Sequence, residues 1–173
     1  MQRLMLRHTA RLRPSWTAEV KKGGAHTQTT TSVETGKLVV SASSERADRT
    51  LMGHSWGGTF ALYALFMGGE LFRRFVVVSP DLPMGDGYIE KCERDYAARH
   101  TRLPANLYLA YAEYELNDWH LPHIRPFMES LQSRRYSGLR FFYQTFSQCR
   151  HCGVIAPAFQ SGLWNVFELP VLI

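Results

Sequence analysis

Three kinds of side chain in this sequence could together perform nucleophilic chemistry. Ser55 stands in Gly53-His54-Ser55-Trp56-Gly57, a G-x-S-x-G pattern, and His151 stands near the C-terminus. Three acids lie between them in the chain: Glu113, Glu115 and Asp118. A serine hydroxyl is a weak nucleophile until a base accepts its proton, and a carboxylate orients that base. The sequence therefore contains the parts of a serine–histidine–acid triad, provided that the fold brings them together.

The G-x-S-x-G pattern predicts a nucleophile elbow where a strand enters it and a helix leaves it. Residues 49–52 have the composition of the end of a short strand, and residues 59–67 (TFALYALFM) predict a helix that is buried on nearly all sides. The two outer glycines stand where a tight turn leaves no room for a side chain. We therefore predict Ser55 as the nucleophile and the N–H of Trp56, at the helix N-terminus, as an oxyanion donor. An ordinary glycine-rich turn is the alternative.

Strands and helices alternate along the chain after this turn. Strands are predicted at 75–78, 103–112 and 139–146, and helices at 87–100, 122–136 and 154–167. A helix between each two successive strands requires parallel strands and right-handed crossovers, so we predict an α/β fold with three layers and a mostly parallel sheet. The loops at the carboxyl ends of such strands form the site, and the serine, the acids and the histidine all follow predicted strands.

The base is assigned more firmly than the acid. His151 lies in the loop after the last predicted strand, where it would accept the Ser55 proton, although a solvated loop histidine is the alternative. Glu113 and Glu115 lie two residues apart, so both would point to the same side of an extended segment. Spacing alone does not choose between them, and either could be a solvated turn residue.

From about residue 46 to residue 167 the chain resembles an esterase family of the α/β-hydrolases that includes the siderophore esterases related to enterobactin esterase. The matching pieces are RTLMGHSWGG (49–58), ALYALF (61–66), VSP (78–80), His151, VIAPA (154–158) and GL (162–163). The chain order serine, acid, histidine is also the order of the α/β-hydrolases. The resemblance implies a serine esterase that cleaves carboxylic esters through an acyl-enzyme, with siderophore-type lactones as the suggested substrates.

The resemblance also favours one acid. In this family a Gly-x-x-Glu stretch follows the corresponding strand, and Ala112-Glu113-Tyr114-Glu115 stands there in this chain. The match implies Glu115 as the acid of the triad, with Glu113 and Asp118 as alternatives. Ala112 departs from the family, which tends to have glycine at that position.

Residues 1–44 differ from the rest of the chain in composition. They carry seven of the basic residues and two acids, which accounts for the whole net charge of +5, because residues 45–173 carry 13 of each sign. We predict a mostly irregular basic segment over 1–44, with a short strand at 37–41, followed by a partial hydrolase domain over 45–173. No basic stripe interleaved with aromatic residues crosses the second part, so we expect no nucleic-acid partner.

The family has several strands before the elbow, and residues 1–44 show no match to them. We therefore expect a domain truncated on its N-terminal side, with the elbow strand exposed at the sheet edge and self-association through that edge. A loop among the missing strands would supply the second oxyanion donor, which stays unassigned. A catalytically impaired remnant that acts as a binding or interaction module is the alternative function, and acyl transfer by the same residues is another.

The remaining expectations concern partners and location. We expect a small-molecule ester substrate, with His54 and Arg150 as candidate substrate contacts, and neither cofactor nor metal. Cys149 and Cys152 form a C-x-x-C pair, but a redox or zinc role needs more ligands than the sequence places. His120 and His123 could share one helix face as metal ligands, but beside Trp119 and Pro122 we expect them to cap a helix start and line the cleft rim. Three cysteines, an odd number, argue against a secreted disulfide framework, and no apolar run is long enough to span a membrane, so a cytoplasmic protein is expected.

Overall fold

The computed structural model describes residues 49–83, 85–115 and 120–168 with their side chains. Four earlier strands are described by their backbone: β1 (Gln2–Met5), β2 (Thr17–Val20), β3 (Thr27–Val33) and β4 (Gly36–Ala42). β1 and β2 form an antiparallel pair of their own.

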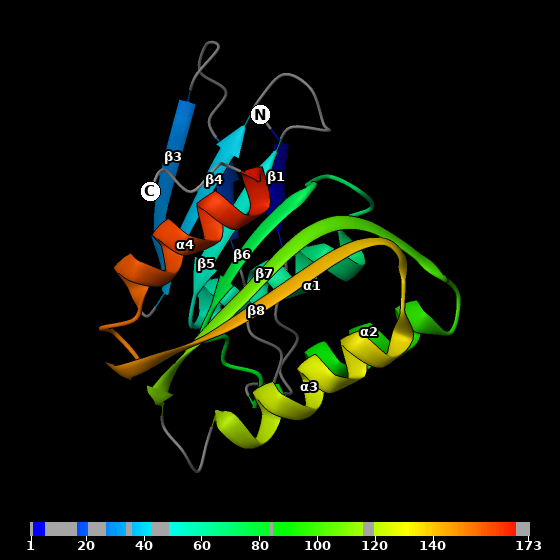
Figure 1. The fold of residues 1–173 in the computed structure, drawn as a ribbon. Helices are drawn as coiled ribbons and strands as arrows, with labels where there is room; N and C mark the ends of the chain where they lie inside the picture. Colours follow the sequence, from blue (N-terminus) through cyan, green and yellow to red (C-terminus); the bar gives the residue numbers. More distant parts are fainter. Residues whose placement is uncertain are drawn as a thin grey trace.

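A six-stranded sheet with the order β3-β4-β5-β6-β7-β8 carries the fold (Figure 1). Its later strands are β5 (Thr50–His54), β6 (Arg74–Val78), β7 (Arg102–Tyr114) and β8 (Ser137–Arg150). These four run parallel to one another, whereas β3 and β4 are antiparallel to each other and β4 is antiparallel to β5. The predicted parallel sheet is therefore present, and β8 continues four residues beyond the predicted end of that strand.

Four helices connect and cover the parallel strands: α1 (Trp56–Met67), α2 (Tyr88–Ala97), α3 (Leu121–Arg134) and α4 (Ile155–Phe167). The first three pack on one face of the sheet and α4 packs on the other (Figure 1). The three-layer α/β architecture is confirmed. Among the described residues, no helix is both long enough and apolar enough to cross a membrane.

Alternation along the buried strands divides the core between the two faces. Phe75 and Val77 of β6 belong to the core under α1, α2 and α3, whereas Val76 and Val78 belong to the core under α4. This is the side-chain period of two that a strand imposes. Gly162 lets α4 lie directly on the sheet, because a Cβ at that position would be 2.4 Å from Val76 Cγ1.

The N-terminal stretch differs from its prediction. The strand expected at 37–41 is present as β4, but β3 covers a threonine-rich stretch that was predicted to be irregular, so that prediction is wrong. Threonine is β-branched and favours strands even in a polar sequence. β4 pairs with β5 from Leu38↔Gly53 to Ser41↔Thr50, so the expectation that the elbow strand lies exposed at an edge is also wrong. The division near residue 45 and self-association stay predictions.

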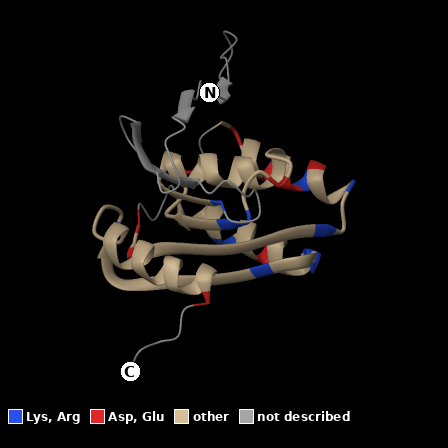
Figure 2. Ribbon diagram, turned by 90° about the horizontal axis from the view of Figure 1, so that it is seen from above, with Lys and Arg blue, Asp and Glu red and all other residues tan. Residues whose placement is uncertain are grey.

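Basic and acidic residues are both distributed along the described ribbon (Figure 2). One buried carboxylate joins two helices: Glu93 of α2 is 1% exposed and accepts hydrogen bonds from Arg134 Nε at 2.9 Å and from the Tyr136 hydroxyl at 3.0 Å. Arg134 lies in the last turn of α3. This ion pair therefore fixes α3 against α2 on the same side of the sheet as α1.

Candidate active site

The elbow that the sequence predicts is formed by the end of β5 and the start of α1. Ser55 lies between them with φ 56° and ψ −124°, a backbone conformation that costs free energy in a residue other than glycine. Gly53 is required there, because a Cβ would lie 2.1 Å from the Gly57 carbonyl oxygen. The Ser55 N–H donates to the Val78 carbonyl at 3.0 Å, which fixes the turn against β6.

Four polar residues each follow a parallel strand by one position. Ser55 follows β5, Ser79 follows β6, Glu115 follows β7 and His151 follows β8. The strand register aligns Ser55 with Ser79 and Glu115 with His151, because His54 pairs with Val78 and Tyr114 pairs with Arg150. Val78 pairs with Ala110, so β7 continues from Ala110 to Tyr114 beyond the end of β6 before it reaches Glu115. The carboxyl ends of parallel strands meet at one edge of a sheet, so these residues gather there.

His151 and Glu115 form a hydrogen-bonded pair at this edge. His151 Nδ1 lies 2.8 Å from Glu115 Oε2; the Glu115 side chain has no exposed surface, and that of His151 is 23% exposed. The backbone carbonyl of His151 accepts a hydrogen bond of 2.8 Å from Nε2 of His54, the residue before Ser55. The loop that carries His151 is thus attached directly to the elbow.

Glu115 accepts hydrogen bonds on both of its oxygens. Ser79 Oγ and the Ala112 N–H donate to Oε1, while His151 and His120 donate to Oε2. Burial would raise the pKa of Glu115, but these hydrogen bonds outweigh burial and hold its pKa well below the ordinary value. Glu115 is therefore an ionised carboxylate inside the protein.

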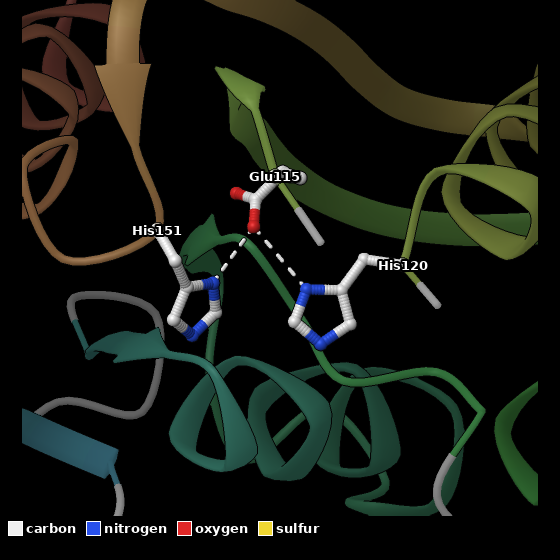
Figure 3. A group of neighbouring side chains, drawn as sticks. All are labelled: Glu115, His120 and His151. Atoms are coloured by element: carbon white, nitrogen blue, oxygen red, sulfur yellow. Dashed lines mark hydrogen bonds and ion pairs between the residues drawn. The ribbon is translucent and has the colours of Figure 1, made fainter. Parts of the chain in front are cut away.

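His120 is the site residue that sequence reasoning missed. We expected it to cap a helix and line the cleft rim; it occupies the N-cap position of α3 but makes no side-chain cap. Its ring is buried, with Nδ1 3.2 Å from Glu115 Oε2 and Nε2 3.8 Å from Asp81 Oδ1. Figure 3 shows Glu115 between His120 and His151. The signal was a histidine five residues after the predicted acid, in the same strand-end loop.

Of the other predicted acids, the structure describes Glu113 alone, and it does not join this cluster. Glu113 is exposed and accepts a hydrogen bond from the Gln148 N–H at 2.8 Å. The period-two argument placed it beside Glu115, and that was wrong because β7 ends at Tyr114, before Glu115. Asp118 lies outside the described residues.

The remaining candidates occupy varied surroundings. His54 is 4% exposed, and burial, followed by the neighbouring His151, lowers its pKa to about 4. Trp56 is the first residue of α1, and its indole Nε1 donates to Asp81 Oδ2 at 2.9 Å. Arg150 is exposed at the end of β8. Substrate contacts by His54 and Arg150 stay predictions, and a second oxyanion donor is not assigned among the described residues.

Neither His120 with His123 nor Cys149 with Cys152, the two pairs considered as metal ligands from the sequence, forms a metal site in the described structure. His120 is directed at Glu115, whereas His123 Nδ1 lies 3.5 Å from Glu90 Oε1 on α2. Cys149 and Cys152 are both free thiols. A different set lies close together, since one ligand atom each of Glu115, His120 and His151 fall within 4.8 Å of one another.

Comparison with solved structures defines the class of fold. The siderophore hydrolase EstA from Aspergillus nidulans matches with a TM-score of 0.63 and 20% identity, over 70% of this chain and 48% of that one. The IroE-like serine hydrolase from Shewanella oneidensis matches with a TM-score of 0.62 and 21% identity, over 69% and 40%. The S-formylglutathione hydrolase FrmB from Staphylococcus aureus matches with a TM-score of 0.56 and 16% identity, over 72% and 53%.

These likenesses show that the chain has an α/β-hydrolase-type fold, and they confirm the predicted resemblance to siderophore-esterase structures at the level of the fold. The chain spans less than half the length of the siderophore hydrolase EstA and of the IroE-like hydrolase. No protein-family profile matches the sequence, and no curated protein matches it. The names of these structures are those of hydrolases.

Proposed function

We propose that this chain carries the active site of a serine hydrolase that cleaves carboxylic esters through an acyl-enzyme. The observation that carries the proposal is the pair formed by His151 and Glu115, 2.8 Å apart, in a loop hydrogen-bonded to the residue before Ser55. A buried, ionised carboxylate on Nδ1 of a histidine, whose loop is bonded to the residue before a serine on a strained strand-to-helix turn, supports the arrangement that activates a hydroxyl.

The proposed steps use these groups in turn. Ser55 Oγ attacks the ester carbonyl while His151 Nε2 accepts its proton, and Glu115 stabilises the imidazolium that forms. The N–H of Trp56 at the start of α1 donates to the oxyanion. His151 then protonates the leaving alcohol, and water releases the acyl group by the same steps in reverse order.

The proposed substrates are small-molecule esters, with siderophore-type lactones as the class that the family resemblance suggests; EstA is named a siderophore hydrolase. The cytoplasm remains the proposed location. Product analysis distinguishes hydrolysis from acyl transfer, since both use the same acyl-enzyme.

A fluorophosphonate probe tests the proposal without knowledge of the substrate. The purified chain should gain the mass of one phosphonyl group, and Ser55→Ala should abolish that gain. Ser133→Ala is the matched control, because Ser133 is exposed on α3 and bonds only a local carbonyl in the described structure. Unchanged labelling of Ser55→Ala would place the nucleophile elsewhere and overturn the proposal.

A further inference from the structure

Glu115 holds one more imidazole than the proposed triad uses. A triad needs a single histidine on its carboxylate, but here a second ring, that of His120, lies 3.2 Å from the same oxygen and is 3% exposed. The two rings lie on either side of Oε2, with their centroids 4.9 Å apart (Figure 3). Two imidazoles thus meet at one carboxylate oxygen inside the protein.

This donor set matches what Zn²⁺ takes from proteins. Zinc binds imidazole nitrogen and carboxylate oxygen at about 2.0–2.2 Å in a tetrahedral arrangement, so neighbouring ligand atoms stand about 3–3.5 Å apart. The two Nδ1 atoms lie 2.8 Å and 3.2 Å from Glu115 Oε2, and one ligand atom from each residue falls within 4.8 Å of the others. Zinc spacing therefore requires ligand atoms that stand up to 4.8 Å apart to move closer together, with both imidazole nitrogens turning from Glu115 Oε2 towards a shared ion.

The residues behind the ligands also fit a metal site. Ligating carboxylates are themselves hydrogen-bonded, and the second nitrogen of a ligating histidine commonly faces a carboxylate. Glu115 Oε1 is held by Ser79 Oγ and the Ala112 N–H. His120 Nε2 faces Asp81 Oδ1 at 3.8 Å, so a proton on Nε2 would point at a carboxylate.

We propose that Glu115, His120 and His151 bind Zn²⁺ in a two-histidine, one-carboxylate site, and that the bound ion switches Ser55 off. When Nδ1 of His151 coordinates the ion, the neutral ring carries its one proton on Nε2. If the ring was doubly protonated before binding, the proton on Nδ1 is released to solvent. Nε2 is then a donor and cannot accept the Ser55 proton. The partly exposed His151 gives the ion its way in. Binding stands on the geometry alone, whereas inhibition also rests on the proposed function.

Binding is tested with Co²⁺ as a spectroscopic probe and Zn²⁺ as its competitor, on the full chain freed of metal with EDTA. Cys149→Ser/Cys152→Ser serves as the background, because this thiol pair could chelate metal independently. We expect visible cobalt bands typical of tetrahedral nitrogen and oxygen ligands, displaced by equimolar Zn²⁺. His120→Gln should weaken cobalt binding by at least about tenfold. Loss of a residue that only hydrogen-bonds a metal ligand already lowers metal affinity by about this factor.

His123→Gln is the matched control, since His123 lies on the same helix but faces Glu90, and it should bind cobalt as the background does. His151→Gln, at a partly exposed position, repeats the ligand test if His120→Gln does not fold. Cobalt affinity equal to that of the background in both ligand variants, or no binding at all, overturns the site.

Inhibition is tested by the rate of fluorophosphonate labelling with and without Zn²⁺. Zn²⁺ should slow labelling of the background protein at least tenfold, and EDTA should restore the original labelling rate. In His120→Gln, the labelling rates with and without Zn²⁺ should be nearly equal. Labelling that is absent even without metal refutes the proposed function but leaves the cobalt result to decide the site. Cobalt binding together with labelling that Zn²⁺ does not slow refutes the switch.

Discussion

His54 and His151 are joined by a hydrogen bond from a side chain to a backbone carbonyl, Nε2 to O, of 2.8 Å. A carbonyl oxygen only accepts, so Nε2 of His54 carries a proton. The rings lie 4.5 Å apart between centroids. Because His54 immediately precedes Ser55, this bond sets the position of the proposed base relative to the nucleophile. His54 is thus a positioning residue in the proposed mechanism.

We predict that His54→Ala lowers kcat about tenfold or more with a smaller effect on KM, because a small displacement of a base is costly to rate. His54→Gln, which keeps an N–H donor, should recover part of the loss. Steady-state kinetics with an activated ester measures both constants. Equal kcat values for His54→Ala and the unaltered chain would show that the bond does not position His151.

The stability of the protein should depend on His54 in mildly acidic solution. Burial lowers the pKa of His54 to about 4 in the folded state, against 6.5 for an ordinary histidine. At a pH between these two values, His54 is more protonated in the unfolded chain than in the folded protein. The free energy of unfolding should therefore fall as the pH is lowered from 6.5 towards 4. Urea denaturation at successive pH values measures it.

His54→Gln should flatten this pH dependence, and His123→Gln, at an exposed site, should not. Glu115 acts in a different window: its pKa is lowered, so its contribution is present above the ordinary 4.5 and is lost as the pH falls below that value. A slope above pH 4.5 that is identical in His54→Gln and the unaltered chain would contradict the assignment.

Glu115→Gln should lower kcat by about 10⁴, because an amide at this position favours the wrong histidine tautomer. Glu113→Gln is the informative comparison, since Glu113 is exposed and bonded to the Gln148 N–H. Ester hydrolysis by the two variants separates the assignments. Wild-type activity in Glu115→Gln would move the acid to Glu113 or Asp118.

The ion pair between buried Glu93 of α2 and partly exposed Arg134 of α3 predicts a stability effect away from the chemistry. Glu93→Ala leaves the buried Tyr136 hydroxyl without its acceptor and Arg134 without its partner, so the free energy of unfolding should fall by about 2 kcal/mol. Glu129→Ala, at an exposed position on α3, is the control and should change it by less than about 0.5 kcal/mol. Urea midpoints that coincide for the two variants would refute this role of Glu93.

Local patterns in the sequence were sufficient to predict the elbow and the parallel strands. Gly53 and Ser55 fall in a pattern whose geometry is determined by neighbours in the chain, and the apolar run 75–78 predicts a buried strand. The threonines of β3 were misread because a polar stretch was taken to be irregular, although β-branching favours strands. Pairing of β4 with β5 depends on contacts between segments, which composition does not reveal.

The second histidine of the cluster could not be predicted for a related reason. Whether His120 caps α3 or reaches Glu115 depends on how the start of α3 is placed against the end of β7, and no periodic pattern in the sequence predicts that placement. The choice between Glu113 and Glu115 likewise depended on where β7 ends. Strand ends are determined by pairing with β8, through Tyr114 and Arg150, and not by the residues themselves.

Each site residue stands one position beyond its strand, and this makes the chain unequally tolerant of insertions and deletions. A residue added to a surface turn between a helix and the next strand leaves the strand ends where they are. A residue added within β7 or β8 reverses the faces of the strand residues that follow it and moves Glu115 or His151 by one position, about 3.3 Å, away from its partner. Natural variation in length should therefore accumulate in the connections at the opposite edge of the sheet, while the lengths of the parallel strands stay constant.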